Sequence, residues 1–312
     1  MSSAGEGRCP VCAAPLRTGL CDWHRVCPRC AYEGSTLVPR IDTQAAGGDL
    51  DEVAREQALG TLRRRNFARL AARLAAPSRS LAGDGAKPRL LDVGCAHGWF
   101  LEAVADTFAA EGLEPDAAIA AASRARGLAV RDGYFPDALA PGERWDVIAF
   151  NDVLEHIPDV DAVLAACRRH LRPGGLLVVN APDRRGTLYR VGKALARVGR
   201  PGAFARLWQH GFPSPHVHYF DDASLGTLAG RHGFGLRTRL RLPAVGLAGL
   251  RERVRYGGDV SPMKGAAIAA AVAIAIPALA LLPGDIHAWI FRREDREDGE
   301  RSSGFDGTPG DP

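Results

Sequence analysis

The chain has 312 residues, 46% of them hydrophobic, which suffices for the core of one large domain or of one domain with a small appendage. Its net charge of +4 at pH 7 and pI near 8.8 are mildly basic and spread along the chain, so composition indicates no strong attraction to nucleic acid or to a membrane. Residues 1–8 are small and polar and precede a group of cysteines, so we predict no secretory signal and a cytoplasmic location.

Five of the seven cysteines lie within the first thirty residues, and four of these form two C-x-x-C pairs that are separated by fourteen residues. In a chain without a secretory signal, such pairs favour metal binding over disulfides. We therefore predict a zinc-ribbon-like segment over residues 1–48, with a structural Zn²⁺ held by Cys9, Cys12, Cys27 and Cys30. Cys21 and His24 also have ligand spacing, and the sequence leaves open whether they bind the metal.

A helical pattern covers residues 50–76, and a stretch rich in Pro, Gly and Ser follows over residues 77–88. We assign residues 49–88 to this helix and linker. The run Arg63–Arg65 lies opposite the apolar residues of the helix, where it could contact an acidic partner or form a solvated face.

The stretch Arg89–Leu101 reads as a buried strand, a turn of small residues and the start of a helix that we predict over residues 99–111. Gly94, Ala96 and Gly98 allow a tight turn whose backbone can approach a ligand closely. A strand, turn and helix of this kind predict a nucleotide-type binding element beyond the carboxyl end of the strand.

Strands and helices then alternate, which predicts an α/β fold with a parallel sheet covered on both faces. We expect the later strands over residues 112–114, 128–131, 145–150, 176–180, 235–242 and 285–292. Polar residues end several of them: Glu114 can bind ribose hydroxyls, Asp132-Gly133 follow the third strand, and Asn151 follows the fourth. Pro173-Gly174-Gly175 is predicted to end a helix over residues 160–171.

Three further segments complete the chain. Residues 183–215 are predicted to form a mostly helical cap, and residues 294–312, which are charged and rich in glycine, a disordered tail. Residues 266–282 are apolar but mostly alanine and contain Pro277, so we favour a buried or surface-lying helix over a membrane span. Contact of this helix with a membrane or a lipid-like substrate stays open, and with it membrane association of the protein.

Together, residues 89–293 resemble a class I S-adenosylmethionine (SAM)-dependent methyltransferase of the ubiquinone-biosynthesis type. The resemblance rests on Leu90–Gly98 (LLDVGCAHG), Glu114, Phe150–Pro158 (FNDVLEHIP), Leu171–Gly175 (LRPGG) and His216–Phe220. It implies a seven-stranded Rossmann-like sheet. A dinucleotide fingerprint would instead require glycine at Ala96 and Trp99.

The resemblance also implies roles for individual residues. The backbone at Gly94, Ala96 and Gly98 would contact the methionine part of SAM, and Asp92 would support the turn. Glu114 would bind the ribose, Asp132 and Gly133 the adenine, and Asn151 the rim near the methionine end. Ala96 departs from the glycine that is usual there.

We expect in-line methyl transfer to a small-molecule or lipid-like acceptor, with oxygen as the receiving atom, although the cradle is common to O-, N- and C-methylation. His156, His216 and His218 are the candidate bases, each with a bracing role as the alternative. A second hypothesis is a nucleic-acid- or protein-binding zinc ribbon attached to a degenerate methyltransferase fold, motivated by the C-x-x-C pairs and Arg63–Arg65. The oligomeric state is not indicated.

Overall fold

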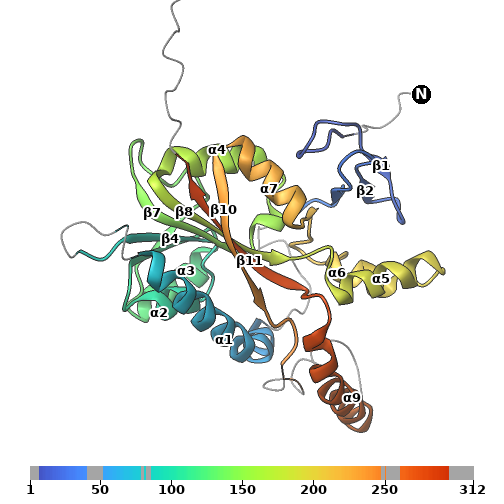
Figure 1. The fold of residues 1–312 in the computed structure, drawn as a ribbon. Helices are drawn as coiled ribbons and strands as arrows, with labels where there is room; N and C mark the ends of the chain where they lie inside the picture. Colours follow the sequence, from blue (N-terminus) through green and yellow to red (C-terminus); the bar gives the residue numbers. More distant parts are fainter. Residues whose placement is uncertain are drawn as a thin grey trace, which may run out of the picture.

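The computed structural model describes residues 7–40, 52–78, 81, 86–246, 250 and 261–294. Its main sheet has seven strands, in the spatial order β10 (Phe234–Leu242), β11 (Ile286–Arg293), β8 (Leu171–Pro182), β7 (Trp145–Asn151), β4 (Arg89–Val93), β5 (Ala109–Glu114) and β6 (Val130–Asp132) (Figure 1). The predicted α/β fold with a seven-stranded Rossmann-like sheet is confirmed.

One strand of this sheet runs against its neighbours. β11 pairs antiparallel with both β8 and β10, so the prediction of an all-parallel sheet is wrong at this edge. Leu242 at the end of β10 lies opposite Ile286 at the start of β11. The chain therefore turns back between adjacent strands, and this connection produces antiparallel pairing.

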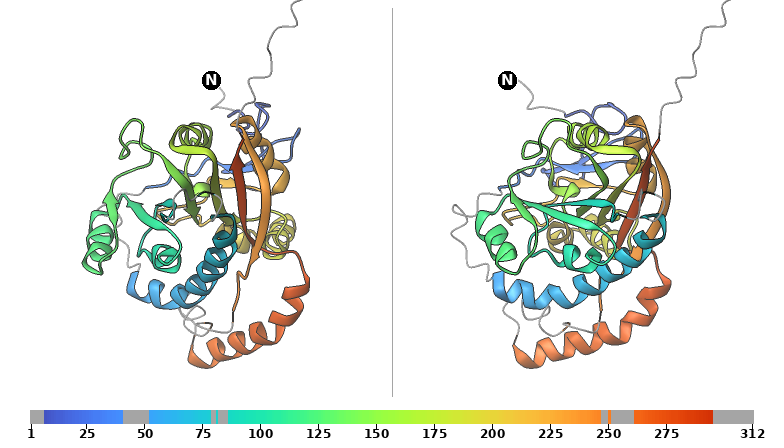
Figure 2. Two further views of the ribbon diagram at one scale, coloured as in Figure 1. Left: turned by 60° about the vertical axis from the view of Figure 1, so that its left-hand side comes forward. Right: turned by 90° about the vertical axis from the view of Figure 1, so that its left-hand side faces the viewer.

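Helices cover both faces of the sheet (Figure 2). Alternate residues of β4 and β7 point to opposite sides, so Leu90 and Val147 join one core while Leu91 and Ile148 join the other. The first core packs under α1 (Glu52–Ser78) and α2 (Trp99–Val104), with α3 (Ala117–Ala125) beside them. The second packs under α4 (Val160–His170) and α7 (Asp222–Arg231).

Two element boundaries differ from the prediction because strand pairing overrides local pattern. α2 ends at Val104 rather than near residue 111, since Ala109–Glu114 pair with β4 from Arg89 onward and form β5. The segment Leu171–Gly175 does not simply end α4. Leu171 already pairs with Trp145, and a register shift separates this pair from Val147 opposite Leu176.

A second, four-stranded sheet lies beside the first and contains β1 (Arg17–Thr18), β2 (His24–Val26), β3 (Glu33–Ser35) and β9 (His218–Tyr219). The first three strands come from the N-terminal cysteine-rich segment. β9 comes from the segment between the cap and α7, and it pairs antiparallel with β3 through Glu33 opposite Tyr219 and Gly34 opposite His218. The N-terminal segment is therefore joined to the main fold by backbone hydrogen bonds.

The predicted cap contains α5 (Thr187–Arg197) and α6 (Gly202–Leu207). Its aromatic side chains, Tyr189, Phe204 and Trp208, are buried together with Tyr219 of β9. Trp23 of the N-terminal segment stacks on Phe204 with ring centroids 5.8 Å apart. The cap thus packs against the cysteine-rich segment, as the neighbouring positions of α5, α6 and β2 in Figure 1 also indicate.

The predicted apolar helix over residues 266–282 is found as α9 (Pro262–Leu281). In the described part of the chain, no helix combines the length and the hydrophobicity needed to cross a membrane. Of the predicted tail, residues 295–312 lie outside the described residues, as do residues 1–6 and 41–48 of the predicted ribbon segment and 79–80 and 82–85 of the predicted linker.

Candidate active site and metal centre

The turn after β4 is shaped by three residues with positive φ angles: 67° at Gly94, 44° at Ala96 and 70° at Gly98. A Cβ at Gly94 would lie 2.7 Å from Val153, and one at Gly98 would lie 2.3 Å from Leu128. Gly94 is therefore required by packing as well as by φ, whereas Gly98 is required mainly by φ, because the end of the Leu128 side chain can shift. Ala96 adopts the left-handed conformation despite its side chain, which strains the backbone at the candidate cofactor cradle.

Glu114, at the end of β5, reaches back to this turn. One carboxylate oxygen accepts a hydrogen bond from the Ala96 amide at 2.8 Å, and the other accepts one from the Asp116 amide at 3.0 Å. Burial raises the pKa of the Glu114 carboxyl. Each oxygen keeps a second lone pair, so the predicted contact with two ribose hydroxyls is compatible with the bracing of the turn.

Three polar side chains at neighbouring strand ends form a buried chain of hydrogen bonds. The Asn151 amide of β7 donates to the Asp92 carboxyl of β4 at 2.9 Å, and Asn180 of β8 donates to the Asn151 oxygen at 3.5 Å. Burial raises the pKa of Asp92 to about 7, although the bond from Asn151 opposes this. Asn151 therefore lies inside the edge of the sheet, where it locks β4 to β7.

The expected adenine-side residues lie at the end of β6, the neighbour of β5. Asp132 is opposite Glu114 in the β5–β6 register and forms an ion pair with Arg124 at 2.9 Å. The Gly133 amide donates to the Glu114 carbonyl at 3.2 Å, with φ at 125°. The predicted cofactor residues Asp92, Gly94, Ala96, Gly98, Glu114, Asp132, Gly133 and Asn151 thus all lie on consecutive strand ends β6, β5, β4 and β7.

A cluster of titratable residues follows β7 on the short helix η2 (Leu154–His156). One potential ligand atom each from Glu155, His156 and His216 lies within 4.8 Å of the others, so the set could hold a proton or a metal ion. The two imidazole rings are 4.7 Å apart, and His156 Nε2 is 4.0 Å from Glu155 Oε1. Two of the three predicted candidate bases are therefore side by side.

The environment of this cluster disfavours charge on its most buried members. Burial and the nearby Asp152 raise the pKa of Glu155 well above its usual value. Burial and His156 lower the pKa of His216 well below its usual value. Glu155 Oε2 and His216 Nδ1 are buried atoms without a hydrogen-bond partner among the described residues. Such atoms are rare in folded proteins and are consistent with a site that receives a ligand.

His218, the third candidate base, is held on both ring nitrogens. Its Nε2 donates to the Ile157 carbonyl at 2.9 Å, and the Tyr32 hydroxyl bonds to its Nδ1. Burial lowers its pKa to about 4. These contacts leave no ring nitrogen to take a proton from an acceptor, so His218 joins the N-terminal segment to η2.

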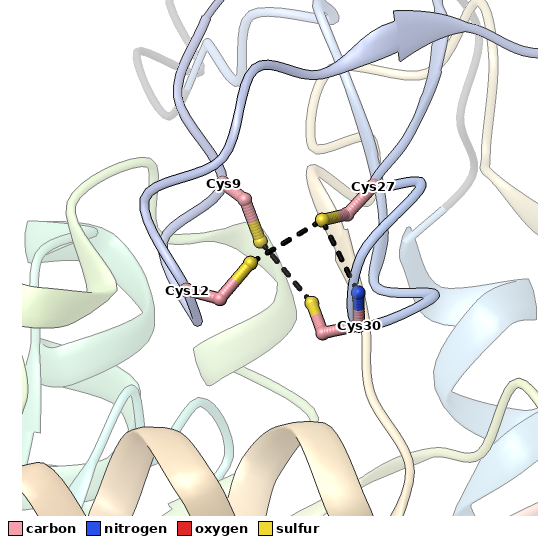
Figure 3. A group of neighbouring side chains, drawn as sticks. All are labelled: Cys9, Cys12, Cys27 and Cys30. Carbon is pink, nitrogen blue, oxygen red and sulfur yellow. Dashed lines mark hydrogen bonds between the residues drawn. The ribbon is translucent and has the colours of Figure 1, made fainter.

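The four predicted metal ligands converge (Figure 3). The sulfur atoms of Cys9, Cys12, Cys27 and Cys30 lie within 4.8 Å of one another, with 3.5 Å from Cys9 to Cys30 and 3.4 Å from Cys12 to Cys27. Four Zn–S bonds of about 2.3 Å in a tetrahedron require sulfur separations of roughly 3.8 Å. Although burial opposes it, backbone N–H groups of Cys30 and Arg29 help lower the pKa of Cys27 to about 7, which favours the ligating thiolate. The donor set fits Zn²⁺.

The open question about Cys21 and His24 is resolved for the histidine. His24 Nδ1 accepts from the Leu20 amide at 3.1 Å, and Nε2 bonds to Glu33 at 3.0 Å, so both nitrogens are used. Glu33 also accepts from Tyr189 at 2.8 Å and Lys193 at 2.5 Å. Burial would raise the pKa of Glu33, but these bonds lower it to about 2. Cys21 is not part of the cluster of four sulfurs.

Two arginines of the run singled out from the sequence form ion pairs within the chain. Arg63 of α1 pairs with Asp152 at 3.2 Å, and Arg64 pairs with Glu102 of α2 at 2.6 Å. Other residues of this region were not singled out from the sequence. Glu155 stands next to His156 in the FNDVLEHIP motif, which was the available signal. No sequence signal was available for Glu33 and Tyr32, because the residues that they contact are distant in sequence.

The chain was compared with known proteins. A family model described as a methyltransferase domain matches residues 58–238. The ubiquinone biosynthesis O-methyltransferase of Cereibacter sphaeroides is 37% identical over 103 residues, and that of Sinorhizobium medicae is 38% identical over 104. Each alignment covers 31% of this chain and 42% of the relative, so the similarity spans less than half of either protein.

Among solved structures, a putative sarcosine dimethylglycine methyltransferase from Galdieria sulphuraria aligns with a TM-score of 0.47 and 17% identity, covering 73% of this chain and 85% of that one. The family match begins within α1 and ends within β10, so it includes the cradle, η2, the cap and β9. It spans more than half of the sequence. The chain therefore belongs to the class I SAM-dependent methyltransferases.

Proposed function

We propose that the protein transfers a methyl group from SAM to a hydroxyl oxygen of a small-molecule or lipid-like acceptor, with His156 as the general base. The observation that carries this proposal is the orientation of His156. Its Nδ1 lies 3.0 Å from the Pro215 carbonyl, which can only accept, and 3.1 Å from the Ser214 hydroxyl. A proton on Nδ1 satisfies the carbonyl, and Nε2 is then the basic nitrogen. A base with a fixed tautomer suits an acceptor that must lose a proton.

Bound SAM supplies an electrophilic methyl group on a sulfonium sulfur. The cradle contributes by holding the donor: Glu114 fixes the Ala96 amide, and Asp92 with Asn151 fixes the strand ends on either side. Such positioning provides most of the acceleration in an in-line displacement. His156 Nε2 takes the hydroxyl proton, and Oε1 of the Glu155 carboxyl lies 4.0 Å from this nitrogen.

The choice of oxygen as the receiving atom is supported by the relatives, which are named O-methyltransferases of ubiquinone biosynthesis. Because less than half of each relative is covered, the acceptor is proposed only as a class, a hydroxyl-bearing small molecule. We further propose that the four cysteines hold a structural Zn²⁺. Four protein ligands leave no open position for chemistry.

The alternative of a nucleic-acid- or protein-binding zinc ribbon receives no support from the arginine run that motivated it. Arg63 and Arg64 form ion pairs within the chain. The cysteine-rich segment also buries Cys9, Val11 and Tyr32 in the same core as β4 and β7.

The test measures methyl transfer to a panel of phenols, catechols and amines, with the formation of S-adenosylhomocysteine (SAH) as the readout. We expect turnover with hydroxyl-bearing acceptors, and a fall in kcat of about 100-fold in His156→Gln, because general-base catalysis is lost. SAH affinity, measured by calorimetry, should not change. The matched control is His232→Gln, which changes a histidine that pairs with Asp161 on α4. Full activity of His156→Gln, or transfer to amines alone, would contradict the proposal.

A further inference from the structure

The helix α9 carries an unusual surface. It is apolar on all sides apart from Lys264, yet several of its large side chains are exposed: Met263 by 86%, Ile274 by 80% and Leu281 by 89%. Figures 1 and 2 show the helix projecting from the main sheet. A helix that is hydrophobic all round normally lies in a core or in a membrane. The exposed apolar surface of α9 therefore indicates a binding surface.

The connections of α9 determine how it could meet a bilayer. Its flanking strands β10 and β11 are paired neighbours, with Leu242 opposite Ile286. If α9 crossed a bilayer, residues 243–261 would have to cross as well. That stretch carries four charges between residues 251 and 255, and charges are costly in hydrocarbon. If α9 meets a bilayer, it therefore lies along the surface and does not cross it.

A basic hollow adjoins the carboxyl end of α9. It has a volume of about 1180 Å³ and is lined by α5, β10 and residues 282–284, with seven arginines and lysines against three carboxylates. Thr187 at the start of α5 donates to the Pro283 carbonyl at 2.9 Å, which fixes α5 beside the end of α9. The positive hollow and the apolar helix are therefore parts of one continuous surface.

The exposed side of α5 has the composition of a membrane-facing surface. Arg190 and Arg197 alternate along it with Val191 and Val198, of which Val198 is 72% exposed. Among the described residues, none forms a hydrogen bond or ion pair with the guanidinium groups of Arg185, Arg190 or Arg197. Guanidinium groups bind phosphate bidentately, and arginine stems next to aliphatic residues can lie in an apolar boundary while the charge stays in the headgroup layer.

We propose that α9 and the arginine face of α5 (Arg185, Arg190 and Arg197) dock the protein on an anionic phospholipid surface. α9 lies in the interface with its apolar side chains among the acyl chains, and the three arginines bind lipid phosphates. Neither α9 nor the arginine face alone identifies the partner, but the two together do. A soluble anion would leave the apolar side chains of α9 exposed, and an uncharged apolar partner would leave the three arginines without an anion. This docking does not depend on the identity of the methyl acceptor.

The test is co-flotation of the full-length protein with vesicles of phosphatidylcholine alone or mixed with phosphatidylglycerol. We expect flotation with the mixed vesicles only, and a loss of flotation at high salt. Arg190→Glu with Arg197→Glu should reduce the bound fraction at least about 10-fold, because attraction becomes repulsion. Ile274→Asp with Leu281→Asp should also reduce it, by placing charges in the apolar boundary.

The matched control is Arg144→Glu with Arg169→Glu, which changes the net charge equally at a second basic hollow formed by the ends of α4 and α7. It should float like the unchanged protein. Equal flotation of all variants, or no flotation with anionic vesicles, overturns the proposal. So does competition by inorganic phosphate that abolishes binding at constant ionic strength, where chloride does not, since this assigns the hollow to a soluble anion. A dimer that Ile274→Asp dissociates assigns α9 to a chain–chain interface. Circular dichroism and thermal unfolding establish that each variant is folded.

Discussion

The donor side and the acceptor side of the candidate active site are built differently. On the donor side, Asp92, Glu114 and Asn151 lie at the ends of strands β4, β5 and β7, which are neighbours in one sheet. On the acceptor side, His156 and His216 depend on loops that are joined to the cysteine-rich segment through β9 and Tyr32. The donor site therefore rests on the main sheet alone, whereas the acceptor site rests on contacts between distant segments.

Removal of the metal should give the largest difference between the two sides, because it affects the acceptor side and not the donor side. Cys27→Ser with Cys30→Ser should abolish the one zinc per chain that elemental analysis is expected to find, with a loss on the order of 10 kcal/mol of metal-binding free energy. We expect methyl transfer to be lost while the folded protein still binds SAH in calorimetry. Cys21→Ser is the matched control and should keep its zinc. A folded wild-type protein without metal would refute the assignment.

The second largest effect is expected on the donor side, from the ionisation of Asp92. Its folded pKa of about 7 lies above the ordinary aspartate pKa of about 3.8, so the unfolded chain loses this proton first as pH rises. Stability then falls through this window, and above it the buried charge costs on the order of 4 kcal/mol. Asp92→Asn should thus increase the free energy of unfolding in urea more at about pH 8 than at about pH 5. The exposed Asp137→Asn should show no such difference, and an equal gain at both pH values would disprove the mechanism.

Loss of the Glu114 carboxylate should weaken the donor site while leaving the acceptor side intact. Glu114→Ala removes the acceptor of the Ala96 and Asp116 amides and the expected partner of the ribose hydroxyls. Two charge-assisted hydrogen bonds correspond to about 3 kcal/mol, or roughly 100-fold in SAH affinity by calorimetry. Glu111→Ala, in the same strand, changes a residue that pairs with Arg131 and should bind SAH normally. Unchanged affinity in Glu114→Ala would remove Glu114 from the site.

The smallest effect is expected at the strained turn. Ala96→Gly should raise the free energy of unfolding by about 1 kcal/mol, because glycine adopts the left-handed conformation without steric cost. Ala105→Gly provides a contrast of opposite sign. Ala105 is the C-cap of α2 and has right-handed angles, so glycine relieves no strain there and costs up to about 1 kcal/mol. Both are measured by urea unfolding, and a destabilised Ala96→Gly would show that the turn is not strained.

The sequence predicts where the turn and the strand-end polar residues of the donor side lie, because these signals are local. The turn at Gly94 and Gly98 and the acid at Glu114 each follow directly from the strand that precedes them. The local pattern fails where pairing with a distant strand determines the secondary structure. Ala109–Glu114 is an example, because its sequence resembles the end of a helix but it pairs with β4 as a strand. The antiparallel β11 is missed for the same reason.

The acceptor side is predicted only in part. His156 stands in a recognisable motif, but its partners Pro215 and His216 are brought to it by the return of the cap. The role of Glu33 depends on its hydrogen bonds with Tyr189 and Lys193 of α5. The spacing of residues along the sequence does not predict these bonds. The four cysteines are the exception, because the chemistry of thiolates limits what two C-x-x-C pairs can do.

The pairing of β3 with β9 has a consequence for folding during synthesis. The cysteine-rich segment is synthesised before the strands of the main sheet, but its own sheet lacks its last strand until His218 and Tyr219 have been made. Until then β3 exposes an unpaired edge, which invites pairing with other chains. The edge is short, three residues in β3, which limits that risk. The candidate acceptor side is thus begun before the main sheet and completed late, after β4, β5, β6 and β7, whose ends carry the candidate donor side.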